Sequence, residues 1–206
     1  MNIRFPKAAT VVAARRDLCL DFANTLFWRG SAREETMRGF PDLISWCANS
    51  GLLDREAADR IARWSERRAD EAAEIFRDAI DAREVIFRIL FAIAEGRTPD
   101  ATDVAALNRA LERAPVRRAL AYRDGGFGWR MEAAAAQASS ILAPVLWSAA
   151  DLIVGGDRAR LRRCANNKCL WLFLDESRNG SRRWCSMQAC GNRAKAHRHY
   201  LKTRSA

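Results

Sequence analysis

The sequence predicts a mainly α-helical protein with minor β-structure, in which a small zinc module follows an N-terminal helical domain. Three observations support this prediction. Apolar residues recur at helical spacing over much of residues 41–154, four cysteines near the C-terminal end form two matched pairs, and basic residues crowd around those pairs. With 206 residues, 49% of them hydrophobic, the chain can form one or two domains with a buried core. We expect a helical domain over residues 1–156 and the zinc module over residues 157–206.

Helices are expected in the N-terminal domain over residues 41–50, 55–68, 70–95, 102–113 and 132–154. Asp54 is a suitable N-cap for the second of them, and Gly51 and Gly96 stand where helices commonly end. The last helix should bend or break before Pro144, because proline removes a backbone donor. The Gly-Gly pair at 155–156 then predicts a hinge into the zinc module.

Two further segments of this domain have strand patterns. Leu18, Leu20 and Phe22 alternate with their neighbours, which predicts one face of a short strand. Residues 120–130 contain Asp-Gly-Gly at 124–126, which predicts a hairpin that turns there. The helical domain is therefore expected to carry a short strand and a hairpin.

Four cysteines have the spacing of a metal site. Cys164 and Cys169 are separated by four residues, as are Cys185 and Cys190, and fifteen residues lie between the two pairs. Four thiolates suit the tetrahedral preference of Zn²⁺ and leave no coordination position open for water. The alternatives are a disulfide or an iron–sulfur cluster, although cluster motifs usually crowd three cysteines together. We expect one structural zinc ion in a treble-clef- or ribbon-like module, and its reduced thiols imply a cytoplasmic protein.

The positive charge of the chain is concentrated in this module. From Arg158 onward there are thirteen Lys and Arg residues and two acidic residues, a net charge of +11, whereas residues 1–157 carry −1. Such asymmetry suggests that one part of the chain binds a polyanion, most commonly nucleic acid. The alternative is a solvated tail that keeps the protein soluble.

Two segments of the module offer side chains for nucleic-acid contacts, namely the loop at 177–183 and a helix expected from Met187 onward. We expect Cys190, Ala194, His197 and Leu201 to share the helix face that points toward the metal. The candidate nucleic-acid-binding residues are Arg178, Asn179, Arg182, Arg183, Asn192, Arg193, Lys195, Arg198 and Lys202.

Arg193 is the candidate for reading base sequence, because the metal site should hold the backbone of the helix start. A rigidly held arginine can make a bidentate contact with guanine, whereas a loosely held basic residue mostly screens phosphate. The alternative is that Arg193 pairs with Asp175 or with a carbonyl group inside the module.

The residues around the second cysteine pair also resemble a known family. Residues 184–195 read Trp-Cys-Ser-Met-Gln-Ala-Cys-Gly-Asn-Arg-Ala-Lys and resemble the signature of the CGNR zinc finger, named for the string at 190–193. Residues 18–25, Leu-Cys-Leu-Asp-Phe-Ala-Asn-Thr, resemble the opening of the ABATE domain that precedes this finger in bacterial proteins. The resemblance covers essentially the whole chain. It implies a stress-induced transcription regulator that binds DNA.

The N-terminal domain is a candidate sensor or dimerisation unit, so a small-molecule effector and a homodimer are candidate partners. Its candidate ligand pocket consists of Asp21, Asn24, Thr25, Trp28 and Arg29, which combine polar groups with an aromatic ring. The alternative is that these residues cap helices and pack in the core.

Other classes of function have little support in the sequence. It lacks G-x-S-x-G, H-E-x-x-H, P-loop and dinucleotide-binding motifs, and a fully thiolate zinc site has no open position for catalysis, so no enzyme is expected. Residues 133–150 carry no charge but are too rich in alanine and polar residues to span a membrane. We expect a DNA-binding transcription regulator. The alternative is an RNA- or protein-binding zinc adaptor without DNA sequence specificity.

Overall fold

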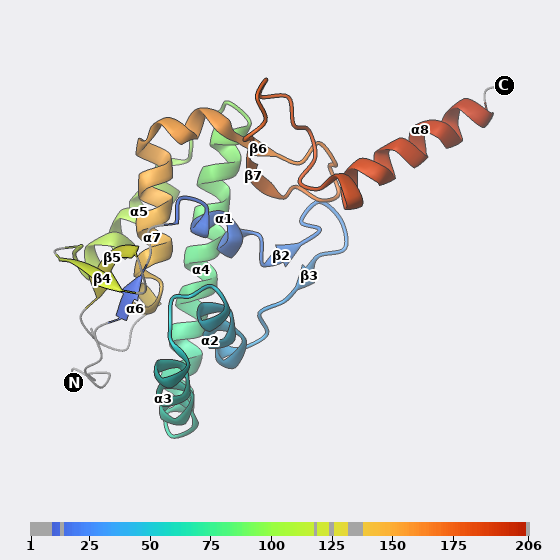
Figure 1. Cartoon of the computed structure of the whole chain (residues 1–206). Coiled ribbons are helices and arrows are strands. Elements are labelled where there is room, and N and C mark those ends of the chain that lie inside the picture. The colour runs from blue at the N-terminus through green and yellow to red at the C-terminus, as the bar shows by residue number, and fades with distance from the viewer. Residues whose placement is uncertain (1–9, 13–14, 118, 124–125, 132–137, 205–206) are drawn as a thin grey trace.

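The computed structural model describes residues 10–12, 15–117, 119–123, 126–131 and 138–204. Helices form most of the molecule, and a small cysteine-rich module packs at one end of them (Figure 1). The expected fold class, mainly helical with minor β-structure before a small metal-binding module, is confirmed.

The N-terminal part is built around one long central helix, α4 (Ala69–Ala94). It contacts the other helices α1 (Leu18–Ala23), α2 (Phe40–Asn49), α3 (Arg55–Glu66), α5 (Ala101–Arg113) and α6 (Ala138–Ile141). The last helix of this part, α7 (Ala143–Val154), packs against α1 and α5. Over the described residues, no helix combines the length and the apolar character that crossing a membrane requires.

The expected helix ends are confirmed where the sequence named them. The side chain of Asp54 accepts a hydrogen bond from the Ala57 amide at 2.7 Å and so caps α3. Gly51 and Gly96 follow α2 and α4 with φ of +74° and +69°, a conformation that glycine adopts without steric cost. The expected break at Pro144 is also present, because α6 ends at Ile141 and Pro144 lies in the first turn of α7. Residues 132–137 of that expected helix lie outside the described residues.

The strand expected from Leu18, Leu20 and Phe22 is wrong, since these residues lie in helix α1. The alternating pattern was misleading because Cys19 and Ala23, between and beyond those residues, are buried as well. The short helix α1 packs against both α4 and α7 and buries nearly all its side chains. Its apolar residues therefore show neither the helical period of about 3.6 residues nor the strand period of about 2 distinctly.

The β-structure consists of short antiparallel pairs. The expected hairpin is formed by β4 (Leu120–Arg123) and β5 (Gly126–Met131), and β1 (Thr10–Val12) pairs with the other edge of β5. Arg123 pairs with Gly126, and residues 124–125 of the expected turn lie outside the described residues. A second pair, β2 (Leu26–Phe27) and β3 (Glu34–Glu35), was not expected from the sequence.

The cysteine-rich module is not separated from the helical core. A 3-10 helix at Gly156–Arg160 follows α7 and leads into β6 (Leu161–Arg163), which pairs with β7 (Leu172–Leu174). Leu161, Leu172 and Leu174 are buried in the same apolar cluster as the residues of α1, α4 and α7. The β6–β7 hairpin therefore forms part of the main core, although the cysteines beyond it form a cluster of their own.

Candidate metal centre and nucleic-acid interface

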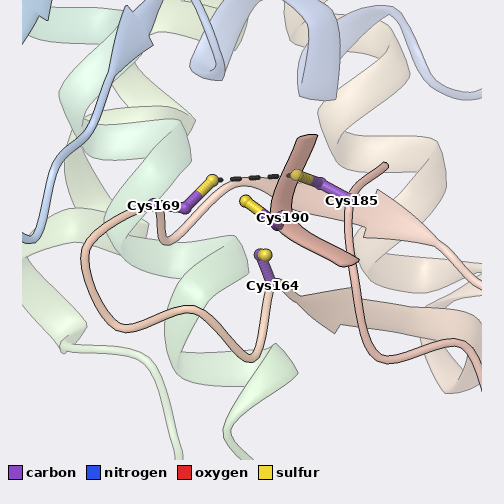
Figure 2. A group of neighbouring side chains, drawn as sticks. All are labelled: Cys164, Cys169, Cys185 and Cys190. Carbon is purple, nitrogen blue, oxygen red and sulfur yellow. Dashed lines mark hydrogen bonds between the residues drawn. The ribbon is translucent and has the colours of Figure 1, made fainter. Parts of the chain in front are cut away.

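The four cysteines come together from two chain segments. Cys164 and Cys169 lie in the loop that connects β6 with β7, and Cys190 lies in a π-helical turn (Met187–Gly191) that Cys185 precedes. Their side chains converge from these segments (Figure 2), and all four sulfur atoms lie within 4.8 Å of one another. One pair comes from a hairpin loop and the other from the start of a helix, an arrangement closer to a treble clef than to a ribbon.

The spacing of the sulfur atoms fits a tetrahedral metal ion. The Cys169 and Cys185 sulfurs are 3.7 Å apart. Four Zn–S bonds of about 2.3 Å in a tetrahedron place the sulfurs about 3.8 Å apart, whereas a disulfide requires about 2.0 Å. The residues present therefore fit Zn²⁺ as a closed structural site.

A side-chain hydrogen bond to one sulfur and the charge balance of the four sulfurs support the same assignment. The Asn166 side-chain amide donates to the Cys190 sulfur at 3.5 Å, a contact that stabilises a thiolate. Hydrogen bonds from Cys169 and Cys185 lower the pKa of the Cys164 thiol, while the same crowding raises the pKa values of Cys169 and Cys185. Four thiolates this close need a cation between them, because like charges otherwise oppose ionisation.

Family comparisons cover both parts of the chain. The ABATE family, described as "putative stress-induced transcription regulator", matches residues 16–156. This chain belongs to the ABATE family. The CGNR zinc finger family matches residues 160–203, in the order that the sequence motifs predicted. None of the curated proteins matches the chain.

The CGNR zinc finger and the four cysteines at ligand distance support one structural zinc ion, which confirms the expected cofactor. Cys164, Cys169, Cys185 and Cys190 would hold it. The ion would act by joining the hairpin loop to the helix start, because every coordination position would be filled by sulfur.

The ABATE domain contacts the finger through the segment that follows α1. The Asn24 side-chain amide donates to the Leu172 carbonyl at 2.8 Å, and its oxygen accepts from the Leu172 amide at 3.0 Å. The Gly30 amide donates to the Lys168 carbonyl at 3.2 Å, and the rings of Phe27 and Trp171 lie 4.9 Å apart. Buried two-sided bonding of this kind holds the finger against the domain in a fixed register.

The five candidate pocket residues lie at or near this contact. Asp21 is exposed and forms an ion pair with Arg15 at 2.5 Å. Asn24 is buried, and its side chain is hydrogen-bonded to the backbone of Leu172. Thr25 donates to the Phe22 carbonyl at 2.8 Å. These groups are engaged within the chain, as the capping and packing alternative expects. The ligand pocket stays a prediction.

Trp28 and Arg29 connect the two parts of the molecule. Trp28 packs against the cysteine cluster with a φ of +52°. A non-glycine residue in this region costs about 1–3 kcal/mol, and it persists only where surrounding contacts hold it there. Arg29 binds both carboxylate oxygens of Glu84 at 2.6 and 3.0 Å and lies over the Phe87 ring at 3.8 Å. Arg29 therefore anchors to α4 the same segment that reaches the finger.

Sequence reasoning missed a buried ion-pair network beneath this segment. Arg83 of α4 is buried, donates to the two carboxylate oxygens of Glu35 at 2.8 and 2.6 Å, and donates to Glu84 at 2.9 Å. A signal was present, because Arg83 interrupts the apolar stripe of α4 between Ala79 and Ile86. A charge in such a stripe indicates a buried pair.

The structure separates the candidate nucleic-acid-binding residues by their contacts. Arg182 donates to the carbonyls of Trp184 and Cys185 and lies over the Phe173 ring at 4.4 Å, so it shapes the finger itself. Arg183 lies over the Trp184 ring at 5.5 Å, and the Asn192 side chain donates to the Gln188 carbonyl at 3.4 Å. Among the described side chains, the exposed candidates with no side-chain hydrogen bond or ion pair are Arg178, Asn179, Arg183, Arg193 and Lys195. The side chains of Arg198 and Lys202 lie outside the described part of the chain.

The loop at 177–183 is organised by one buried carboxylate. Asp175 accepts hydrogen bonds from the Ser177 hydroxyl at 2.5 Å, the Ser177 amide at 2.9 Å and the Arg182 amide at 2.9 Å. The Ser177 hydroxyl is the main reason that the pKa of Asp175 lies below its usual value. The carboxylate of Asp175 is therefore occupied by this loop. The alternative in which Asp175 pairs with Arg193 is wrong.

The final helix, α8 (Asn192–Arg204), leaves the body of the protein (Figure 1). We expected His197 and Leu201 to face the metal, and this is wrong, because His197 is exposed and Leu201 is 50% exposed. The reason is the direction of the helix axis, which leads away from the cysteines, so only the first turn stays close to them. Beyond its first turn, α8 consequently extends away from the ABATE domain (Figure 1).

Proposed function

We propose that this protein is a DNA-binding transcription regulator that contacts DNA through its CGNR finger. The observation that carries the proposal is the protruding basic helix α8. It holds Arg193, Lys195, Arg198, Lys202 and Arg204, and no acidic residue occurs from 177 to the C-terminus. Its 13 residues extend about 20 Å, which suits the major groove of a duplex.

The candidate contacts divide into three roles in this proposal. Arg193, in the first turn of α8 beside the metal site, reads a base edge. Arg178, Asn179, Lys195, Arg198 and Lys202 track phosphates, together with Arg183 and Asn192 at the rim of the site. Arg182 holds the loop in shape, because its guanidinium is bonded within the finger.

The ABATE domain has a separate proposed role as the regulatory part of the chain. Residues 1–156 would sense an effector or form the dimer, and residues 157–206 would contact DNA. The candidate pocket around Asp21, Asn24, Thr25, Trp28 and Arg29 is the proposed effector site. Its position supports this role, because the same segment contacts the finger.

The test is a selection experiment with the full-length protein. A random 20-base-pair duplex pool, with double-stranded RNA and single-stranded DNA of equal length as competitors, should yield an enriched duplex DNA sequence. If about five phosphates are neutralised, the logarithm of the binding constant should fall with the logarithm of salt concentration with a slope of about −4 to −5.

A matched pair of charge reversals locates the binding surface. Lys195→Glu on α8 should weaken DNA binding strongly, whereas Arg77→Glu, an equal charge change at an exposed position of α4, should leave it nearly unchanged. Enrichment of RNA over duplex DNA would favour the RNA-binding adaptor. Tight binding with no enriched sequence and equal losses in both variants would contradict the proposal.

A further inference from the structure

One aromatic residue of the ABATE domain lies directly beneath a basic residue of the finger. The guanidinium of Arg193 lies over the ring of Trp28, with 4.5 Å between the guanidinium carbon and the ring centroid. Trp28 follows β2 in the ABATE domain, whereas Arg193 lies in the first turn of α8. The surface at the start of α8 is therefore built from both parts of the chain.

The Trp28 ring is held from several sides. Its neighbour Arg29 is bound to Glu84 on α4, and the next residue, Gly30, is bonded through its amide to the Lys168 carbonyl. The ring itself packs against the cluster of Cys164, Cys169 and Cys190. A ring held both by the domain and by the metal site offers a rigid platform.

A guanidinium that lies flat on this platform keeps its hydrogen-bonding edge free. A guanidinium binds an aromatic ring through its flat face, while its N–H donors point outward in the plane. Within the described part of the chain, no hydrogen bond or ion pair is recorded for this guanidinium, and the side chain is exposed. A bidentate contact with a base or a phosphate needs these in-plane donors in a defined direction.

We propose that Trp28 is a positioning residue for DNA recognition, which orients the Arg193 guanidinium at the start of α8. The inference rests on the proposed DNA-binding function and adds to it that the ABATE domain supplies part of the reading surface. The finger alone would keep its zinc ion but would hold Arg193 less firmly. Loss of orientation costs affinity for the cognate sequence and leaves general phosphate attraction unchanged.

The experiment is a double-mutant cycle in the full-length protein. Binding is measured for Trp28→Ala, Arg193→Ala and the double variant, on the duplex enriched from a random pool and on an unselected duplex of equal length. Each single variant should weaken binding to the enriched duplex about 5- to 30-fold and leave the unselected duplex within about twofold. The double variant should bind no more weakly than Arg193→Ala, because both changes remove the same contact.

Trp28→Phe is the conservative variant and should restore most of the affinity, because phenylalanine also stacks with a guanidinium. Zinc content and Tm show whether Trp28→Ala still folds. If that variant does not fold, the comparison of Trp28→Phe with Trp28→Leu, which keeps apolar volume without a ring, decides between positioning and packing. Equal binding by the Phe and Leu variants would overturn the proposal. So would a double variant whose fold-loss in affinity equals the product of the two single losses.

A measurement without DNA separates this inference from the proposed function. The Arg193 Nε–Hε resonance, assigned by its loss in Arg193→Lys, should be shifted upfield by the ring current of Trp28 and should move to the position of free arginines in Trp28→Leu. An unshifted resonance in the parent protein overturns the stack, whatever the DNA result. If the stack is present and no DNA is bound, the proposed function fails, and the positioning role fails with it.

Discussion

Gly30 of the ABATE domain and Asn167 of the finger approach each other so closely that no side chain fits between them. A Cβ atom placed on Gly30 would lie 1.8 Å from the backbone oxygen of Asn167. The amide of Gly30 also donates to the carbonyl of Lys168, the residue after Asn167, at 3.2 Å, so the two backbones are in direct contact. The loop that carries the first cysteine pair is thereby held against the segment that carries Trp28.

Gly30→Ala should therefore loosen the contact between the ABATE domain and the finger. The clash is with backbone, which cannot move aside as a side chain can, so we expect a loss of about 1–3 kcal/mol in unfolding free energy, or roughly 3–10 °C in Tm. Gly156→Ala is the matched control, because nothing lies within 4 Å of its added Cβ. Equal Tm values for the two variants would show that the close approach is absent in solution.

Cys185→Ser should abolish the binding of zinc, which in the parent protein should amount to about one ion per chain. Because Leu161, Leu172 and Leu174 of the same segment belong to the main core, the loss should also lower the Tm of the whole protein. Metal analysis and thermal unfolding measure the two effects. Cys47→Ala, at a buried cysteine outside the cluster, should keep the zinc ion, and a metal-free parent protein would contradict the assignment.

Asp175→Ala should release the loop at 177–183 while leaving zinc bound. Three hydrogen bonds from Ser177 and Arg182 would lose their acceptor, so the loop should become more mobile and trypsin should cleave after Arg178 about tenfold faster. Mass spectrometry of timed digests measures this rate. The neighbouring exposed residue offers a control, since Glu176→Ala should leave cleavage within about twofold of the parent.

The buried ion pairs of α4 should make the protein sensitive to acid. Burial opposes ionisation of Glu84, yet hydrogen bonds and charge from Arg29 and Arg83 hold the pKa of its carboxyl below the ordinary value of 4.5. A carboxyl with a lowered pKa in the folded state stabilises the protein above pH 4.5, and this contribution is lost as the pH falls through the folded-state pKa.

Glu84→Gln should remove this pH dependence at a cost in stability near neutral pH. The Tm of the parent should fall more steeply between pH 6 and pH 3 than that of the variant, and the difference between their Tm values should shrink as the pH decreases. Calorimetry across this range measures both curves. Parallel curves would show that Glu84 titrates alike in the folded and unfolded chain.

Much of this protein could be predicted locally. The ends at Gly51 and Gly96, the cap at Asp54 and the β4–β5 hairpin all depend on residues within a few positions of the feature, and all were confirmed. The α1 helix was missed because a short segment buried on nearly all sides has no distinctive period. The direction of α8 was also missed. Its apolar residues suggested a buried face, but the helix points away from the core and that face is exposed.

The sequence by itself determined the chemistry of the metal site and the uneven charge. Two C-x4-C pairs supply four thiolates, and four thiolates are the complete ligand set of a structural zinc site. Only the tertiary structure decided what surrounds them. Trp28 and Arg193 are 165 positions apart in the chain, and neither residue alone indicates the other. Their contact depends on the packing of the finger against the ABATE domain, in which Gly30 meets Asn167, and such long-range packing leaves no periodic signal in the sequence.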